Sequence, residues 1–279
     1  MNILERIVEN KRKEIEKARR EVPVSQLESK PFFSRKTISI KSALRQAEKP
    51  AIISEFKRKS PSKGIINAGV TPEEVTKGYS AAGAVGLSVL TDQDFFGGNF
   101  DDFLAARAAN PQTPMLRKDF MVDEYQLWEA KAIGADLVLL IAACLTPGEV
   151  QQLSQKAHEL GMEVLLEVHN REELEQTLCE TVDIVGVNNR NLKNFVTSVE
   201  VSLELAEMIP DTFVKISESG LKDAETIWQL YDAGYKGFLI GETFMKTADP
   251  AAALAALQQE IQNYRNIDNL RVGVSPGQF

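Results

Sequence analysis

The spacing of hydrophobic residues changes near Pro50 and divides the chain into two parts. Before this point, apolar residues recur at intervals of three, four or seven, a spacing typical of an amphipathic helix. The stripe covers residues 2–22 and consists of Leu4, Val8, Ile15, Ala18 and Val22. Pro23 ends the helix because proline cannot continue one. A second, short helix is predicted around residues 42–47.

The polar side of the first helix carries a basic run, Lys11, Arg12 and Lys13, interleaved with Glu14 and Glu16. Mixed charges of this kind are typical of a solvated helix face rather than of a surface that binds nucleic acid. We therefore expect this run to face water.

After Pro50, short β-rich apolar runs alternate with amphipathic helical segments. The predicted strands are Ala51–Phe56, Val85–Leu90, Pro114–Lys118, Asp136–Ala142, Met162–Val168, Asp183–Asn188, Phe213–Ser217 and Lys236–Ile240. The clearest predicted helices are Pro72–Ala82, Asp123–Gly134, Pro147–Gly161, Asp223–Ala233 and Pro250–Gln262. Several of these helices begin with Thr-Pro or Asp and end at glycine, as helix caps commonly do.

Eight strand-then-helix units without strand hairpins favour a parallel sheet closed into a barrel. The predicted fold is α/β, a (βα)8 TIM barrel with an N-terminal helical extension. Residues 1–49 would form the extension, 50–266 the catalytic barrel and 267–279 a C-terminal tail without a pattern. Such a barrel needs about 250 residues, which suits a chain of 279.

Composition restricts the possible partners. The net charge is −8, whereas nucleic-acid binders normally present a basic face. An anionic ligand must therefore be held by local positive charge and backbone N–H groups. Cys144 and Cys179 belong to no metal-binding pattern and are expected to be reduced thiols. Without an apolar leader in the first thirty residues or a membrane-length apolar run, we expect a cytoplasmic protein with no nucleic-acid or membrane partner. The oligomeric state is not indicated.

Polar residues gather at the ends of four predicted strands, which is where TIM barrels place their active sites. Alternate residues of a strand face the same side. The residues that share a side are Glu55 with Lys57, Lys118 with Phe120, and Asn188 with Arg190, and Glu167 lies near the end of the fifth strand. If these sets face inward, the barrel mouth is a polar, ligand-binding surface. The alternative for any single residue is an outward salt bridge to a helix.

Barrels often bind phosphate in the loops after strands seven and eight. Here those loops contain residues 217–220 (Ser-Glu-Ser-Gly) and 240–242 (Ile-Gly-Glu). Small residues let backbone N–H groups approach an anion. Ser60 and Lys57 are placed to close the same site from the first loop.

These stretches resemble one family, the indole-3-glycerol-phosphate synthases, over essentially the whole chain. The most specific stretches are residues 53–62 (ISEFKRKSPS), 116–120 (LRKDF), 166–169 (LEVH), 186–192 (GVNNRNL) and 217–220 (SESG). The resemblance implies a cofactor-free carboxy-lyase of tryptophan biosynthesis. Such an enzyme closes the ring of 1-(2-carboxyphenylamino)-1-deoxyribulose 5-phosphate, a small phosphorylated substrate, with loss of carbon dioxide and water.

The resemblance also implies a role for each matching residue. Lys118 would be the general acid at the substrate carbonyl and Glu167 the general base. Glu55 and Lys57 would form a coupled pair that binds substrate and supplies a proton for dehydration. The remaining roles are contacts to sugar and carboxylate for Asn188, Arg190 and Glu218, ring walls for Phe96 and Phe120, and phosphate binding for Ser60, Ser219, Gly220 and Gly241.

One position departs from the family pattern. The family often has serine where Glu242 stands, and a carboxylate beside phosphate would repel it. We therefore expect Glu242 to offer only its backbone N–H and to turn its side chain away. Of the two histidines, His158 is expected at the surface. His169 follows Glu167 by two residues and is expected to cap a loop, with contact to the site rim as the alternative.

Two other functions compete with this interpretation. One is a related barrel such as phosphoribosylanthranilate isomerase, which would be expected to have cysteine or aspartate where Glu55 and Lys57 stand. The other is an inactive barrel that serves as a scaffold and docks through its N-terminal helix. Glu55, Lys57 and the positions of the two cysteines argue against the first, and the complete set of acids and bases argues against the second. A fluorescence assay for an indole product separates all three.

Overall fold

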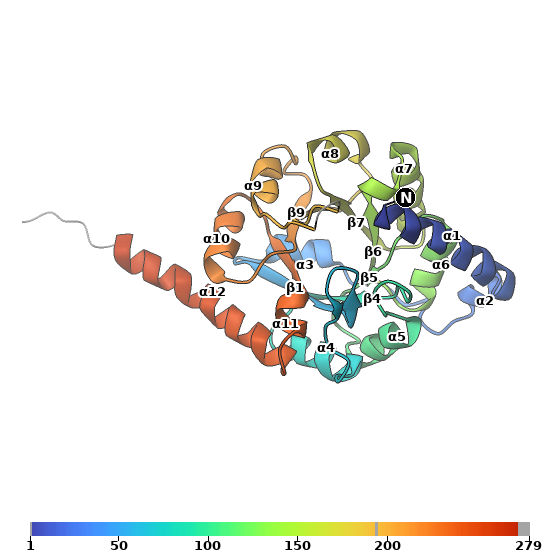
Figure 1. The fold of residues 1–279 in the computed structure, drawn as a ribbon, viewed down its shortest axis with the longest axis horizontal. Helices are drawn as coiled ribbons and strands as arrows, with labels where there is room; N and C mark the ends of the chain where they lie inside the picture. The colour runs from blue at the N-terminus through green and yellow to red at the C-terminus, as the bar shows by residue number, and fades with distance from the viewer. Residues whose placement is uncertain (1, 193–194, 273–279) are drawn as a thin grey trace, which may run out of the picture.

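Eight parallel strands form a closed barrel in the computed structural model, which describes residues 2–192 and 195–272, with side chains to residue 265 (Figure 1). Around the barrel the strand order is β1-β10-β9-β8-β7-β6-β5-β4. Their bounds are β1 (Ala51–Phe56), β4 (Gly86–Leu90), β5 (Met115–Lys118), β6 (Leu137–Ile141), β7 (Glu163–Val168), β8 (Ile184–Asn188), β9 (Val214–Glu218) and β10 (Gly237–Ile240). The predicted TIM barrel is therefore confirmed.

Every predicted strand is present to within one residue at each end. The shift at β9 matters, because the strand continues to Glu218, which the sequence placed in the following loop. The expectation of no hairpin is wrong in one place. β2 (Lys59–Ser60) and β3 (Gly64–Ile65) pair antiparallel in the loop after β1. Strands of two residues are too short to show an alternating pattern, and these lie outside the barrel sheet.

A ring of helices surrounds the barrel (Figure 1). It comprises α4 (Pro72–Ala81), α5 (Phe100–Ala109), α6 (Tyr125–Ala132), the 3-10 turn η1 (Ala142–Cys144), α7 (Pro147–Glu159), α8 (Arg171–Thr177), α9 (Glu200–Ala206), α10 (Ala224–Asp232), α11 (Glu242–Met245) and α12 (Pro250–Val272). As predicted, the side chains of Thr71, Thr146 and Asp223 accept backbone N–H groups in the first turns of their helices. α12 continues to Val272, into the predicted tail, and residues 273–279 lie outside the described residues.

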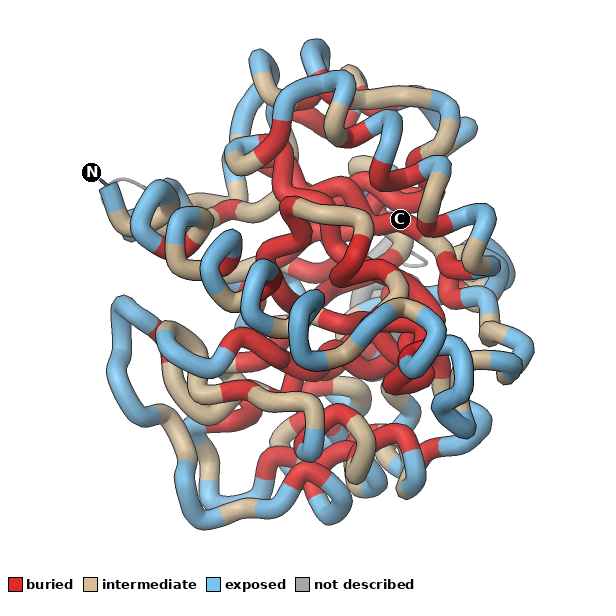
Figure 2. Tube along the Cα trace, turned by 90° about the vertical axis from the view of Figure 1, so that its right-hand side faces the viewer, coloured by how far each residue is buried: buried red, intermediate tan, exposed pale blue. Residues whose placement is uncertain are grey.

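Hydrophobic side chains form two clusters, one inside the barrel and one between strands and helices. Figure 2 shows the buried chain at the centre and the exposed segments at the periphery. Helix α3 (Ile40–Gln46) belongs to the inner cluster and closes the N-terminal end of the barrel. Its Ile40 and Leu44 are fully buried. Gly86 and Gly237 begin their strands there. A Cβ on Gly86 would collide with Ile40, and one on Gly237 would collide with Leu44 and Ile216.

Helix α1 (Ile3–Glu21) lies at the opposite end of the barrel, and α2 (Val24–Glu28) packs on α6. The fully buried residues of α1 are Ile7, Lys11 and Ile15, four residues apart. The prediction for Ile15 is therefore confirmed, but Ile7 was missed. The solvated position predicted for Lys11 is wrong, since only 4% of this residue is exposed. Its partners come from distant loops, which the local charge pattern does not show.

Among the described residues, no helix has the length and apolar composition needed to cross a bilayer. Cys144 and Cys179 are half-buried free thiols that pack against the outer cluster. Within the same part of the chain, no group of three or more His, Cys, Asp or Glu side chains is placed to hold a metal ion.

Candidate active site

A cavity of about 570 Å³ opens at the C-terminal ends of the strands. Every site residue predicted from the sequence lines it, although the strands that carry them are far apart in the chain. They are Glu55, Lys57, Ser60, Phe96, Lys118, Phe120, Glu167, Asn188, Arg190, Glu218, Ser219, Gly220 and Gly241. Ile3, Leu4 and Ile7 of α1 line the same cavity, so this helix covers part of the barrel mouth.

Glu55 and Lys57 form an ion pair at the end of β1, with 2.8 Å between Oε1 and Nζ. The hydroxyl of Ser88, which is the partner of Glu55 in the β1–β4 register, donates to the other carboxylate oxygen at 3.3 Å. Burial acts to raise the pKa of Glu55, but Lys57 and Lys118 outweigh it and hold the pKa below its ordinary value. The carboxylate is therefore ionised.

Lys118 lies between two carboxylates at the centre of the cavity. Its Nζ is 2.6 Å from Glu218 Oε2 and 3.2 Å from Glu167 Oε2. Burial acts to lower the pKa of Lys118, but these carboxylates raise it well above the ordinary value. Arg117, of opposite parity, instead donates to the Gln126 carbonyl and pairs with Glu129. The predicted orientation of this strand is confirmed.

Glu167 has cationic neighbours on two sides. Besides Lys118, its Oε1 is 3.3 Å from Nε2 of His169 and accepts from Asn188 Nδ2 at 3.2 Å. Burial acts to raise the pKa of Glu167, yet Lys118 and His169 hold it well below the usual range. The sequence left the balance of these effects open, and the positions of the two cations decide it.

His169 makes both contacts that the sequence offered as alternatives, the loop cap and an approach to the site. Its Nδ1 is 3.0 Å from Glu173 Oε2, which also accepts the His169 backbone N–H, so the predicted capping contact exists. Its other nitrogen faces Glu167. Burial opposes protonation, but the two carboxylates raise the pKa of His169 to about 10. The spacing of two residues had indicated this approach, because residues 167 and 169 point to the same side of the chain.

Glu218 projects from β9 beside Asn188, its partner in the strand register. Gly186 makes room for it, since a Cβ there would collide with Glu218 Oε1. That oxygen is buried and has no hydrogen-bond partner in the described part of the chain. Burial raises the pKa of Glu218 above its ordinary value, with Lys118 opposing and Glu167 adding to the increase. This carboxyl therefore binds a proton more readily than an exposed glutamate does.

Small residues of the loops after β9 and β10 form one part of the cavity rim. Ser219 and Gly220 have φ values of 70° and 77°, in the left-handed region. A Cβ on Gly220 would lie 2.6 Å from Thr197 Cγ2, and one on Gly241 would lie 2.6 Å from Glu55 Oε1. Ser60 is buried at the same rim, with its Oγ 3.4 Å from that of Ser62.

Glu242 does not turn away from the cavity, contrary to expectation. It lines the cavity, and its Oε2 is 3.2 Å from Arg190 Nη2 while Oε1 is 3.7 Å from Lys63 Nζ. Arg190 and Lys63 stabilise the carboxylate in this position. The expectation from the sequence considered only the repulsion between the carboxylate and a ligand phosphate. Arg190 also donates to Ser62 Oγ at 3.3 Å.

Aromatic and aliphatic side chains form another part of the rim. The rings of Phe96 and Phe120, which follow β4 and β5, lie 5.8 Å apart between centroids and are tilted by 39°. The apolar residues of α1 line the cavity with them. The site thus combines an apolar wall, a central group of acids and bases, and a rim of small residues with nearby cations.

Comparisons with known proteins agree on one family. The family model described as indole-3-glycerol phosphate synthase matches residues 4–257. An indole-3-glycerol phosphate synthase of Bacteroides thetaiotaomicron is 47% identical over 94% of this chain and 99% of its own length. One from Salinibacter ruber is 40% identical over 93% and 96%. Among solved structures, 3-hexulose-6-phosphate synthase from Salmonella typhimurium is similar in fold, with a TM-score of 0.61 and 12% identity over 77% of this chain and 99% of that one.

Proposed function

Because the chain belongs to the indole-3-glycerol phosphate synthase family, a family of carboxy-lyases in tryptophan biosynthesis, we propose how its cavity residues divide the reaction among themselves. The enzyme forms indole-3-glycerol phosphate from 1-(2-carboxyphenylamino)-1-deoxyribulose 5-phosphate. A carbon of the aromatic ring attacks the ketone, carbon dioxide leaves, and loss of water completes the indole. Each step requires a proton to be added or removed at a defined atom.

Lys118 is the general acid of ring closure, and its position between Glu167 and Glu218 is the observation that carries the proposal. The two carboxylates keep the lysine protonated at neutral pH. As the new carbon–carbon bond forms, the ketone oxygen becomes an alkoxide, which is a stronger base than a lysine amine. The proton then passes from Nζ to that oxygen. Loss of carbon dioxide restores the aromatic ring.

Dehydration uses the other groups. The Lys57 ammonium, paired with Glu55, supplies the proton with which the hydroxyl leaves as water. Glu167 is the general base that removes a proton from the neighbouring carbon, and its low pKa keeps it ionised for this step. Glu218, whose Oε1 has no hydrogen-bond partner in the described part of the chain, accepts a hydrogen bond from the substrate. Asn188 contacts the reacting sugar.

The two ends of the substrate occupy different parts of the rim. The aromatic ring lies against Phe96 and Phe120 under α1. The phosphate lies at Ser60, Ser219, Gly220 and Gly241, where backbone N–H groups are accessible at small residues. Arg190 exchanges its ion pair with Glu242 for the carboxylate of the substrate.

The test is the formation of fluorescent indole product by the wild type and by Lys118→Met, which keeps most of the side-chain volume and removes the proton. We expect turnover to fall by about 10²-fold or more, the effect typical of a positioned acid. Unchanged thermal unfolding would show that the fold is intact. Near-normal turnover of this variant would contradict the role of Lys118. A wild type that releases no indole would contradict the function itself.

A further inference from the structure

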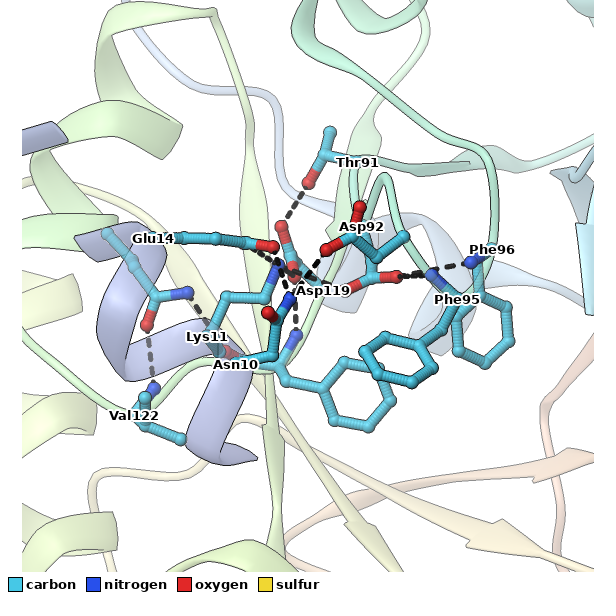
Figure 3. Close-up of polar contacts among 12 residues, drawn as sticks. Asn10, Lys11, Glu14, Thr91, Asp92, Phe95, Phe96, Asp119 and Val122 are labelled. Carbon is cyan, nitrogen blue, oxygen red and sulfur yellow. Dashed lines mark hydrogen bonds and ion pairs between the residues drawn. The ribbon is translucent and has the colours of Figure 1, made fainter. Parts of the chain in front are cut away.

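Lys11 of α1 is a buried cation that the proposed reaction does not use. Only 4% of the residue is exposed. Its Nζ is 3.0 Å from Asp92 Oδ2, 3.0 Å from Asp119 Oδ1 and 2.6 Å from Glu14 Oε2 (Figure 3). The two aspartates follow different strands, β4 and β5. One ammonium group thus connects the N-terminal helix to two loops of the barrel mouth.

Asp92 shapes the first of these loops. Its Oδ1 accepts the backbone N–H groups of Phe95 at 2.9 Å and Phe96 at 3.1 Å (Figure 3). Its Oδ2 is buried and lies 3.0 Å from Lys11 Nζ, so the lysine compensates its charge. A buried carboxylate is costly without a compensating charge. The position of this loop, including Phe96, therefore depends on Lys11.

Asp119 acts in the same way on the second loop. Its Oδ1 accepts the backbone N–H of Phe120 at 2.8 Å, and its Oδ2 accepts from the Thr91 hydroxyl at 2.6 Å. Arg117 gives it a second cationic partner. Lys11 contacts the same Oδ1 that holds Phe120. The two phenylalanines whose rings face each other in the cavity are thus fixed through two carboxylates that share one lysine.

We propose that Lys11 is a positioning residue for the aromatic half of the substrate. It does not touch the ring, but it holds the loops of Phe96 and Phe120 at the spacing that receives the ring. This inference rests on the proposed function for the position of the ring in the cavity. It predicts an effect confined to the aromatic half, because the phosphate rim is built from the loops after β1, β9 and β10.

A purely stabilising role predicts something different. Buried ion pairs add little net stability compared with well-packed apolar groups, and loss of one partner weakens the whole fold. A general loss of folded protein would reduce the binding of every ligand equally. The two roles are therefore separated by comparing ligands that occupy different parts of the cavity.

The experiment uses the full chain, Lys11→Met, and Lys13→Met as a matched control, because Lys13 lies on the same helix with its side chain 69% exposed. Calorimetry gives dissociation constants for 2-aminobenzoate, which represents the aromatic half, and for inorganic phosphate. Misplacing a reacting group by about 1 Å can lower the reaction rate by about 10²-fold. The aromatic ring carries the attacking carbon, so we expect Lys11→Met to weaken 2-aminobenzoate binding about tenfold and to lower kcat/KM by at least as much, with phosphate binding nearly unchanged. Lys13→Met should change none of these values.

Lys11→Arg keeps the charge and tests the inference if the methionine variant does not fold. It should weaken 2-aminobenzoate less than Lys11→Met does and leave phosphate binding unchanged. Equal weakening of both fragments, or unchanged 2-aminobenzoate binding, would overturn the inference. So would a wild type that does not bind 2-aminobenzoate. Absence of indole formation in a wild type that binds both fragments would instead contradict the proposed function alone.

Discussion

The ionisation of Glu167 results from opposing effects on a single carboxyl. Burial acts against the charged form, and the cations Lys118 and His169 favour it more strongly. The pKa of Glu167 therefore lies below its ordinary value, and the group loses its charge only as the pH falls far below neutrality. An enzyme that needs this carboxylate as a base remains competent across the neutral range.

Substitution of Glu167 by Gln tests this role directly. The amide keeps the shape and hydrogen bonding of the side chain but is not basic. We expect turnover to fall by about 10²-fold or more while substrate binding changes only a few-fold, which steady-state kinetics would show. Retention of near-normal turnover would indicate another base, and Glu55 is then the next candidate.

We expect His169 to influence the pH dependence of the reaction by lowering the pKa of Glu167. In His169→Asn the carboxyl loses a cationic neighbour, so the pKa of Glu167 rises and the acid limb of kcat/KM shifts to higher pH. His158→Asn is the control, because His158 is exposed, as the sequence predicted, and pairs with Asp183 away from the cavity. Identical acid limbs in wild type and His169→Asn would contradict this prediction.

The same histidine should affect stability with a defined pH dependence. Its pKa in the folded protein, about 10, is raised above the ordinary 6.5 of an exposed histidine. The contribution of its ion pairs is therefore fully present below about pH 6.5 and is lost as the pH rises through about 10. Urea unfolding should show a larger destabilisation of His169→Asn at pH 6 than at pH 10. An equal difference at both values would exclude a protonated histidine.

Among the elements, the loop after β9 depends on the backbone of Gly220. Valine there would combine an unfavourable positive φ with a Cβ 2.6 Å from Thr197 Cγ2. We expect Gly220→Val to weaken inorganic phosphate binding severely, whereas Ser219→Ala should be mild because the proposed contacts use backbone N–H groups. Gly148→Val is a control for adding a side chain, since nothing lies within 4 Å of a Cβ there. Normal phosphate binding by Gly220→Val would place the phosphate elsewhere.

Helix α1 contributes more to the cavity lining than to the interior of the barrel. Removal of residues 2–22 would take away three apolar residues of the cavity lining and the Lys11 contacts, but it leaves α3 in place. We expect a folded protein with a raised KM, measured by kinetics together with circular dichroism. An unchanged KM would show that α1 does not contribute to substrate binding.

At the scale of the whole molecule, residues 1–49 serve both ends of the barrel. The sequence pattern separated these residues from the barrel as an extension. Within that extension α3 is the part on which the barrel depends, because its Ile40 and Leu44 fill the N-terminal end of the barrel interior. Truncating one buried leucine or isoleucine typically costs about 2–5 kcal/mol, a large part of a domain stability of about 5–15 kcal/mol. Removal of residues 2–49 should therefore lower the unfolding temperature far more than removal of residues 2–22, as thermal scans would show.

The sequence by itself determined the elements and the inward-facing residues. Strand ends were predicted to within one residue, because periodicity, caps and glycine stops act over a few neighbouring residues. The alternation of side chains along the third strand is equally local, and it correctly placed Lys118 in the cavity and Arg117 on the opposite side. Only the tertiary structure decided which charges meet. Lys11 pairs with Asp92 and Asp119, and Arg190 with Glu242, once the closed barrel brings distant strand ends together. Burial and charge partners of an ionisable group depend on that closure, and the local pattern around Lys11 carries no information about it.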